Sequence, residues 1–569
     1  MGGITRITEG DVKYTATGMN LSANDGDFKF NSKSEIQYKS DKVIEHNDYK
    51  APHKEDVMST GINVKLNIFF DGTGNNKTNT AARENANSED HKIYEGIEKH
   101  KKDSFENGIT NVARMFNSVD PKADNQVRVY VEGIGTKDLK EDTQFPGVAI
   151  GKGDTGVEAK VTKGCMDAAE MLYKKKYHKL AIDFLFVNVY GFSRGAAAAR
   201  HFLHVASKMA EYTFQQTVDE KISKYYIRPD YTFNDIKIQQ VHGFELQIEN
   251  TNFIDTYGYF GACLLKNQIK PKKIIFNFVG LYDTLASFGF GHGTDTSDSK
   301  LDSITKARFV YHLASDDEYR DNFPLTNINS CGLRGIEFIL PGVHSDIGGS
   351  YLNNDEEMSA IANVGAWDGK ESRRKVELSR DQEFDTFKKI VVNEGWFTDK
   401  QINKEFFYQE DVNLLTLGLT YRNKYNYGLV GRRKLSNSYD KIPLQLMVKQ
   451  SENFLVVYDV DLLATYAIKD EFIDHIKNCL SRYINEGVNK HNKFGEIFTT
   501  DQNDFVGLSK TYNTELKQLY YQDYITIDDL KKLRNKYLHW SVKCSLTGLG
   551  PKVAGAVPQE LRKRHTYDG

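Results

Sequence analysis

The sequence predicts an α/β fold built on a mostly parallel sheet, and three observations support this prediction. Strand-like and helical segments alternate after residue 60, as they do in a doubly wound sheet. The segment Phe184–Tyr190 is a nearly unbroken apolar, β-branched and aromatic run, which suits a strand that is buried on both faces. A tight glycine-bearing turn and the helix-forming run Ala196–Ala199 follow this strand directly. Strand, turn and helix in this order form the repeating unit of such a sheet.

The other elements of the sheet region can be placed in chain order. Residues 78–125 are polar and mostly helical in pattern, and Val157–Lys175 is predicted to be a helix that precedes the central strand. The predicted strands are Val64–Phe70, Val127–Val131, Phe184–Tyr190, Lys273–Val279 and Ile336–Leu340. We expect the loops that follow these strands to meet at the carboxyl edge of the sheet.

Four regions of the chain differ in composition and pattern. Residues 1–60 are predicted to form a polar N-terminal arm, and residues 61–355 the main α/β domain. Within this domain residues 201–270 lose the strand–helix alternation, so we expect an insertion that caps the site. Residues 356–569 are predicted to form a mainly helical accessory or membrane-contacting domain.

Helical periodicity in the last region occurs at 373–394, 470–487 and Ile527–Leu538. This region also holds a basic, tyrosine-rich segment, Tyr421–Lys434, and a basic run, residues 562–565 (RKRH). Such segments could contact anionic headgroups or simply form a solvated face, and the solvated face is the default interpretation.

The composition excludes several classes of protein. Hydrophobic residues make up 39% of the 569 residues, which is ordinary for a globular chain. A formal net charge of −3 argues against a general nucleic-acid binder. The five cysteines are odd in number and lack metal-ligand spacing, which suggests synthesis in a reducing compartment. No secretory signal and no run of about 18 apolar residues is visible, so we expect no signal peptide and no transmembrane helix.

The turn after the central strand carries the first candidate catalytic residue, Ser193. Residues 191–195 read GFSRG, a Gly-x-Ser-x-Gly pattern between a strand and a helix. In this setting the serine lies at the apex of a strained turn, where side chains at Gly191 and Gly195 would crowd it. Ser193 is therefore predicted to be a nucleophile. If the glycines served only a tight turn, no base and no acid should follow at later strand ends.

A second glycine-rich turn, residues 71–76 (DGTGNN), follows the strand Val64–Phe70. Its backbone N–H groups can point at an anion. We expect Gly72 or Thr73 to donate a hydrogen bond to an oxyanion beside Ser193. The alternatives are a phosphate cradle in a nucleotide site and a simple turn held by Asp71. No Walker or dinucleotide motif accompanies the turn, which favours the oxyanion role.

An acid and a base follow Ser193 at later strand ends. Asp283 comes just after the strand Lys273–Val279, and His344 comes after Ile336–Leu340. Ser, Asp and His therefore occur in the chain order of α/β-hydrolases. His344 would take the Ser193 proton and return it to the leaving group, while Asp283 would hold the imidazole tautomer. The N–H of Arg194 would be the second oxyanion donor.

Three further residues leave alternatives open. Asp346 lies two residues after His344 and could brace the loop, orient His344 or bind a cation, of which bracing is favoured. Asp71 shares this ambiguity; no metal site is predicted, although calcium dependence stays possible. His539 is a rival base because it also follows Ser193 in the right order, but it lies at a predicted helix end rather than after a strand.

Six motifs carry a resemblance to a known family: FFDGTGNN (69–76), EGIGT (132–136), GFSRGAAAAR (191–200), VGLYDTLASFG (279–289), HLASDDEYR (312–320) and PGVHSDIGGSY (341–351). In order and spacing they resemble the phospholipase effectors of bacterial type VI secretion systems, specifically the first class of type VI lipase effectors, within a wider α/β-hydrolase-like family. The resemblance covers about half of the chain. Tyr282 stands where the family pattern has Trp, and this change leaves Asp283 in place.

The resemblance implies an antibacterial phospholipase that cleaves acyl esters of membrane glycerophospholipids, of A1 or A2 type, with the triad Ser193, Asp283 and His344. It implies synthesis in the cytoplasm and delivery by a type VI spike or carrier protein to the periplasm or membrane of a neighbouring cell. It also implies an immunity protein in the producer. We expect no cofactor and no nucleic-acid partner. The alternatives are a soluble carboxylesterase, a nucleotide-binding protein built on residues 71–76, and a catalytically idle interaction module.

Overall fold

The computed structural model describes residues 61–98, 102–143, 153–229, 242–285, 300–320, 322–367, 373–412, 421–500, 519–542 and 562–569. The arm predicted for residues 1–60 lies outside the described residues. Residues from Thr60 to Gly569 belong to one compact unit.

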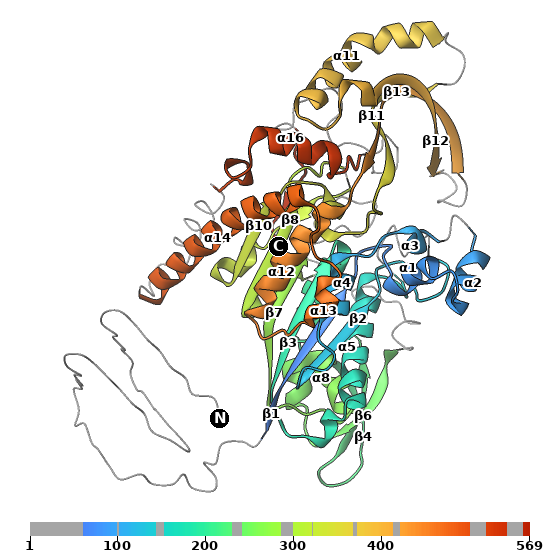
Figure 1. The fold of residues 1–569 in the computed structure, drawn as a ribbon. Helices are drawn as coiled ribbons and strands as arrows, with labels where there is room; N and C mark the ends of the chain where they lie inside the picture. The colour runs from blue at the N-terminus through green and yellow to red at the C-terminus, as the bar shows by residue number, and fades with distance from the viewer. Residues whose placement is uncertain are drawn as a thin grey trace, which may run out of the picture. The chain divides into compact units, whose positions relative to one another are not determined.

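A parallel sheet of six strands forms the centre of this unit (Figure 1). Its order is β10-β8-β7-β3-β1-β2, and all neighbours run parallel. The strands are β1 (Ile62–Phe70), β2 (Gln126–Val131), β3 (Ile182–Phe192), β7 (Lys273–Tyr282), β8 (Phe309–Ser315) and β10 (Gly335–Leu340). The predicted α/β fold class is confirmed, and all five predicted strands are present. The strand β8 was not predicted, because His312 interrupts its apolar run.

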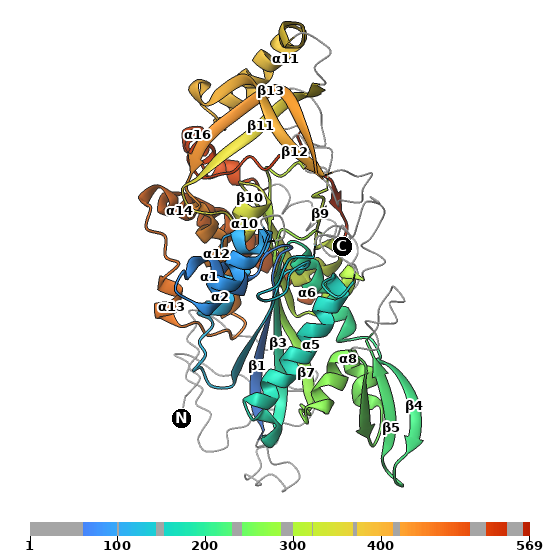
Figure 2. The same cartoon turned by 90° about the vertical axis from the view of Figure 1, so that its right-hand side faces the viewer.

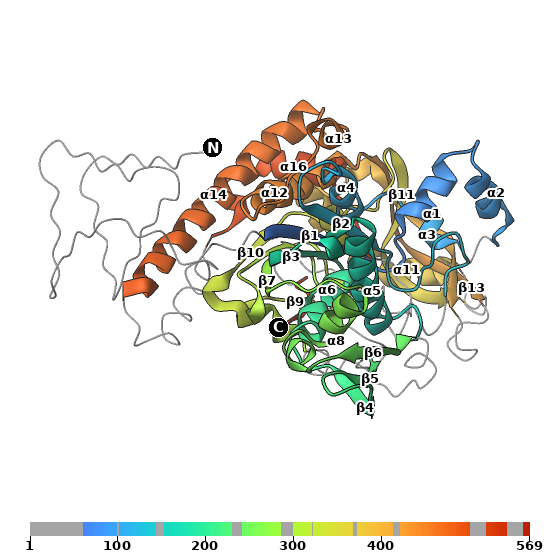
Figure 3. The same ribbon diagram turned by 90° about the horizontal axis from the view of Figure 1, so that it is seen from below.

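Helices cover both faces of the sheet (Figure 3). On one face lie α5 (Val157–Lys174) and α6 (Arg194–Val205), with α8 (Asn252–Lys266) packed against both. On the other face lie α4 (Asn111–Ser118), α12 (Lys441–Glu452) and α14 (Glu471–Thr500). Neighbouring side chains along β1 alternate between the two cores: Phe70 packs with the first group and Phe69 with the second. Burial on both faces explains the continuous apolar strands.

The second half of the chain contributes to this core and also adds a sheet of its own. Its helices include α11 (Arg373–Asn393), α13 (Val460–Ala464) and α16 (Ile527–Lys536). The three predicted helical segments are present as α11, α14 and α16. An antiparallel sheet in the order β11-β13-β12 was not predicted; it is formed by β11 (Asp355–Trp367), β12 (Ile402–Val412) and β13 (Tyr421–Leu435). The domain boundary near residue 355 stays a prediction.

The segment 201–270 contains a small antiparallel sheet made of β4 (Glu211–Thr217), β5 (Ser223–Arg228) and β6 (Phe244–Ile248). The helix α6 starts at the carboxyl edge of the main sheet, and its 12 residues span about 18 Å. It therefore delivers the chain to the opposite edge, where β4–β6 pack beside α8 near the start of β1 (Figures 1 and 2). The cap prediction is corrected accordingly: the described part of this segment does not cover the site.

The remaining elements are short: α1 (Lys77–Glu84), α2 (Glu89–Gly96), α3 (Asp103–Glu106), β9 (Leu325–Thr326), α10 (His344–Gly348) and β14 (Thr566–Tyr567). The strand β14 pairs in parallel with β9, so the described C-terminal residues return to the loop that follows β8. Within the ranges described above, no helix combines the length and the apolar character that crossing a membrane requires.

A row of buried asparagines crosses the middle of the sheet. Asn188 on β3 donates to Asn67 Oδ1 on β1 (2.9 Å), and Asn277 on β7 donates to Asn188 Oδ1 (3.1 Å). The register of β3 and β7 shifts at this level, which leaves Asn277 as an extra residue on β7. The side chain of Asn277 also donates to the carbonyl of Phe454, so the row links the sheet to the chain segment after α12. Buried amides of this kind are tolerated because they satisfy one another.

We predict that Asn188→Ala lowers the free energy of unfolding by about 2–4 kcal/mol, because it leaves two buried amide groups without their central partner. Asn63→Ala is the matched control, since Asn63 lies on β1 with its side chain exposed, and should cost less than about 0.5 kcal/mol. Chemical denaturation of the two variants measures the difference. Equal effects would contradict the role given to this row.

Candidate active site

The candidate site lies at the carboxyl edge of the parallel sheet. The strand β3 ends at Phe192, and Ser193 is the N-cap of α6 with φ 60° and ψ −130°. A positive φ is costly for a residue with a side chain, so surrounding contacts must hold it. The Ser193 N–H donates to the carbonyl of Tyr282 (3.1 Å), and the Ser193 carbonyl accepts from the Leu285 N–H (3.3 Å). These bonds fix the serine against the turn that contains Asp283.

Close backbone packing requires the two glycines of the turn at residues 191–195, which we call the elbow. A Cβ atom on Gly191 would lie 2.3 Å from the carbonyl oxygen of Gly195. A Cβ atom on Gly195 would lie 2.2 Å from the carbonyl oxygen of Asp71. Contacts this short are not tolerated, so a side chain at either position would displace the turn. Gly191 and Gly195 therefore support the turn that carries Ser193 by allowing the backbone segments to approach each other.

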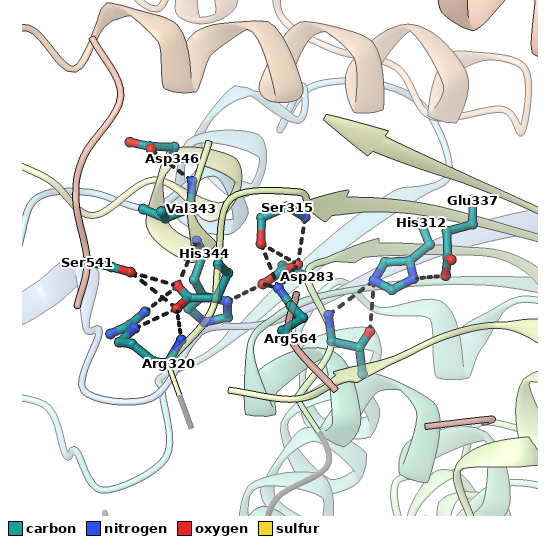
Figure 4. A network of polar contacts seen from close by, with 12 residues as sticks. Asp283, His312, Ser315, Arg320, Glu337, Val343, His344, Asp346, Ser541 and Arg564 are labelled. Carbon is teal, nitrogen blue, oxygen red and sulfur yellow. Dashed lines mark hydrogen bonds and ion pairs between the residues drawn. The ribbon is translucent and has the colours of Figure 1, made fainter. Parts of the chain in front are cut away.

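Asp283 occupies the turn after β7 and also has a positive φ, 43°. Its side chain is fully buried, and Oδ1 accepts from the backbone N–H (2.8 Å) and the hydroxyl (3.1 Å) of Ser315. Nη1 of Arg564 donates to both oxygens, and Oδ2 lies 2.5 Å from Nδ1 of His344 (Figure 4). Burial alone would raise the pKa of Asp283, but Arg564 and His344 outweigh it and hold the pKa well below its usual range. The carboxylate is therefore ionised at neutral pH.

His344 is the first residue of α10, which starts just after β10. Because Asp283 can only accept, Nδ1 of His344 carries the proton and Nε2 is left as the basic nitrogen. Burial lowers the pKa of His344, and Asp283 offsets this only in part, so the imidazole is neutral at pH 7. Its ring centroid lies 4.6 Å from that of Phe192 and 5.2 Å from that of Phe323. The first contact places His344 beside the residue that precedes Ser193.

The predicted oxyanion donors do not all have a free N–H. The N–H of Gly72 donates to Oδ1 of Asp71 (2.7 Å), so the prediction for Gly72 is corrected: this N–H is already used inside the turn. Thr73 is tied to the elbow, because its hydroxyl accepts from Nε of Arg194 (2.8 Å). The backbone N–H groups of Thr73 and Arg194 remain as the two candidate donors.

The carboxyl group of Asp71 is turned into the protein. It accepts from the hydroxyls of Tyr130 (2.5 Å) and Thr110 (2.7 Å) in addition to the Gly72 N–H. Burial raises the pKa of Asp71 to about 6, against the lowering effect of these hydrogen bonds. A Cβ atom on Gly133 would lie 1.8 Å from the Gly72 carbonyl oxygen, so the neighbouring loop packs directly on the turn. This inward arrangement argues against an open phosphate cradle.

Asp346 holds two chain segments together. Its carboxylate accepts from the N–H of Val343 (3.0 Å), and from the N–H (3.1 Å) and Nδ1 (2.7 Å) of His539. The ring of Tyr351 stacks on that of His539 with a centroid distance of 3.5 Å. Asp346 therefore has a bracing position. The rival base His539 is paired with Asp346 and not with Asp283.

A buried ion pair next to His344 was not foreseen. Glu318 accepts from the His344 N–H (3.3 Å) and from Nε and Nη2 of Arg320 (2.9 and 2.8 Å). Burial opposes the ionisation of Glu318, but Arg320 dominates and lowers the pKa of this carboxyl to about 2. Both residues lie in the motif at 312–320, which was visible in the sequence without an assigned role. No sequence signal connected Arg564 to Asp283.

His312 braces the Asp283 turn from the neighbouring strand. Its Nε2 accepts from the N–H of Thr284 (3.1 Å), so its proton is on Nδ1, which faces Oε2 of Glu337 (2.8 Å; Figure 4). Both ring nitrogens are thus used within the protein. His312 supports the site but cannot serve as a second base.

Among the described residues, no group of three or more His, Cys, Asp or Glu side chains could hold a metal ion. The carboxylates of Asp71 and Asp346, which were considered for calcium, are bonded to protein donors.

We predict that Asp71→Asn changes the pH dependence of stability. A carboxyl whose pKa is raised on folding stabilises the fold at low pH, and this contribution is lost as pH rises through about 6. Between pH 5 and pH 7.5 the free energy of unfolding of the wild type should therefore fall by about 1.4 kcal/mol relative to that of the variant, at 1.36 kcal/mol per pKa unit. Urea denaturation at both pH values measures this, with the exposed Asp124→Asn as control. If the difference in free energy of unfolding between wild type and variant is the same at both pH values, Asp71 is not a buried ionisable group with a raised pKa.

The chain is similar to one described family and to solved structures. Residues 65–367, more than half of the chain, match the family described as "T6SS, Phospholipase effector Tle1-like, catalytic domain". A solved structure of the Tle1 effector bound to the VgrG spike from the Type 6 secretion system is 18% identical, with a TM-score of 0.45, and the match covers 92% of this chain and 97% of that one. An uncharacterized protein from Pseudomonas aeruginosa is 13% identical, with a TM-score of 0.33, over 88% of this chain and 65% of that one. No curated protein matches the chain.

The matched residues include the elbow, the 71–76 turn, Asp283 and His344. The chain therefore belongs to the family of Tle1-like phospholipase effectors of type VI secretion systems, which are lipase-type hydrolases.

Proposed function

We propose that this effector is a phospholipase A that hydrolyses acyl ester bonds of membrane glycerophospholipids, of A1 or A2 type, with Ser193 as the nucleophile. The observation that carries the proposal is the hydrogen bond of 2.5 Å between His344 Nδ1 and Asp283 Oδ2, beside the Ser193 elbow. A neutral imidazole oriented by a buried carboxylate is the base that a serine nucleophile requires.

The reaction would begin when Ser193 Oγ attacks the ester carbonyl while Nε2 of His344 takes the hydroxyl proton. The tetrahedral oxyanion would be stabilised by the N–H groups of Arg194 and Thr73. The intermediate would collapse to an acyl-serine, and His344 would return the proton to the glycerol oxygen of the departing lysophospholipid. Water would then cleave the acyl-serine by the same route and release a fatty acid.

Asp283 would stabilise the imidazolium that forms in each step without becoming protonated. Its low pKa in the resting site supports this role, because the carboxylate stays charged throughout the reaction. This sequence of steps uses no metal ion and no cofactor, so we propose none, and calcium is an arm of the test below.

The family assignment means secretion through a type VI system. We propose that the target is the membrane of a neighbouring bacterium, reached from the periplasm, and that the producer holds a cognate immunity protein. We further propose that a type VI spike or carrier protein delivers the chain; the Tle1 effector of the solved structure is bound to the VgrG spike.

We predict that the wild type releases fatty acid and lysophospholipid from mixed phospholipid vesicles, and that Ser193→Ala lowers the rate by about 1,000-fold or more, since it removes the nucleophile. Ser223→Ala, on β5 at the opposite edge of the sheet, is the matched control. Mass spectrometry identifies the products, and the lysolipid isomer formed first distinguishes A1 from A2 cleavage.

Two outcomes would contradict this proposal. Cleavage of a dispersed short-chain ester without any lipid release would indicate a soluble carboxylesterase. No release from either substrate, with and without calcium, would exclude the acyl hydrolase.

We also predict that His344→Gln and His539→Gln differ strongly. His344→Gln removes the base and should lower kcat on a short-chain ester by about 10,000-fold. His539→Gln keeps a donor for Asp346 and should stay within about tenfold of the wild type. Steady-state kinetics of the two variants provide the measurement. A larger loss in His539→Gln would transfer the role of base to His539.

A further inference from the structure

The described C-terminal residues, 562–569, are attached to the loop that follows β8. The N–H of Leu325 donates to the carbonyl of His565 (2.8 Å), and the N–H of Asn327 donates to that of Tyr567 (3.0 Å). The side chain of Asn327 also donates to Asp568 (2.8 Å). This segment is therefore held along its length by backbone pairing.

The strand that receives this segment is itself tied to the catalytic turn. The N–H of Thr326, on β9, donates to the carbonyl of Thr284 (3.0 Å), the residue that follows Asp283. Arg200 on α6 donates to the carbonyls of Thr326 (3.3 Å) and Asn327 (2.9 Å). The segment 562–569 thus docks on a part of the fold that is continuous with both the elbow helix and the Asp283 turn.

Arg564 projects from this segment into the site. Its side chain is only 5% exposed, and one nitrogen, Nη1, lies 3.0 and 2.9 Å from the two oxygens of Asp283 and 2.6 Å from the hydroxyl of Ser315 (Figure 4). The other two nitrogens, Nε and Nη2, are buried and have no hydrogen-bond partner among the residues that the structure describes. A guanidinium with donors unsatisfied in this way is expensive to bury, so its placement must be compensated by the ion pair with Asp283.

We infer that Arg564 is a positioning residue of the catalytic triad, and that residues 562–569 complete the site by bringing its charge to Asp283. The inference rests on the proposed function, because it assumes that Asp283 and His344 act on Ser193. Ser315 binds Oδ1 and Nη1 of Arg564 spans both oxygens, so the carboxylate is fixed with Oδ2 at Nδ1 of His344. The positive charge of Arg564 also weakens the electrostatic effect of the Asp283 carboxylate on the His344 imidazole.

Removing the charge of Arg564 should change the pH dependence of the reaction rate in one direction. The charged groups that face His344 are Asp283, the Glu318–Arg320 pair, and Arg564 behind Asp283. Without Arg564 the Asp283 charge acts on the imidazole without an opposing cation, which favours imidazolium. The acid limb of the rate profile should then move to higher pH.

The test uses the rate at which a fluorophosphonate probe modifies Ser193 in the full chain, followed by mass spectrometry from pH 4.5 to pH 9. In this reaction the Ser193 oxygen bonds to phosphorus, fluoride leaves, and the serine proton passes to His344 and then to solvent. The variants are Arg564→Gln, Arg564→Lys and, as the matched control, Lys563→Gln. Lys563 carries the same charge in the same segment, but its side chain is exposed.

We expect Arg564→Gln to lower the plateau rate constant by about tenfold to 100-fold, as small misplacements of catalytic groups do, and to raise the midpoint of the acid limb by about 1 pH unit. Arg564→Lys should restore the midpoint, since the cation is kept, but not the full plateau, since a flexible ammonium stem does not hold the carboxylate as rigidly as the planar guanidinium does. Lys563→Gln should match the wild type. If Arg564 only stabilised the fold, Arg564→Gln would reduce the fraction of protein that the probe labels without moving the acid limb of the rate profile.

The outcomes separate this inference from the proposed function. If wild-type Ser193 does not react at all, the proposed function fails. If the wild type reacts and Arg564→Gln gives the same plateau and the same acid limb, the role of Arg564 is overturned. If thermal melting shows that Arg564→Gln does not fold, Arg564→Lys decides: an unchanged plateau overturns the inference, and a lowered plateau with an unchanged midpoint supports it.

Discussion

The Asp283 carboxylate is a negative charge without solvent contact, and the site depends on how that charge is compensated. An isolated buried carboxylate would take up a proton rather than stay charged. Here its oxygens receive hydrogen bonds from Ser315, His344 and Arg564. Ser315 ends β8, His344 follows β10, and Arg564 belongs to a segment more than 200 residues further along the chain. The ionised state of the acid is therefore a property of the assembled fold, because no local segment supplies it.

The elbow and the 71–76 turn form a second constraint, based on backbone contact. Gly195 packs against the carbonyl of Asp71, and the hydroxyl of Thr73 accepts from the side chain of Arg194. An oxyanion hole works because its donors are held in place before charge develops on the substrate. Contacts with no room for a methyl group provide such rigidity. The Gly72 N–H is turned inward to Asp71, so the Thr73 N–H is the donor that we propose for this turn.

The sequence was informative wherever an apolar pattern continues through an element. The strands before Ser193, Asp283 and His344 were predicted for this reason, and their loops gather at one edge because parallel strands point the same way. Prediction failed for the strand β8 and for side chains that are supplied from far away in the sequence. His312 interrupts the apolar run of β8, and its partner lies on another strand. Arg564 resembles a solvated basic residue, because charge compensation across the fold leaves no mark on the local sequence.

Chain order alone does not distinguish His344 from His539, because both follow Asp283. The element that precedes each distinguishes them, as the sequence already indicated. His344 begins a helix directly after β10, at the edge where β3 and β7 end, whereas His539 follows α16 and gives its Nδ1 to Asp346. Asp346 also accepts from the N–H of Val343, the residue before His344. The second histidine–aspartate pair therefore fixes the backbone from which His344 projects, and we propose that His539 supports His344 rather than replacing it as the base.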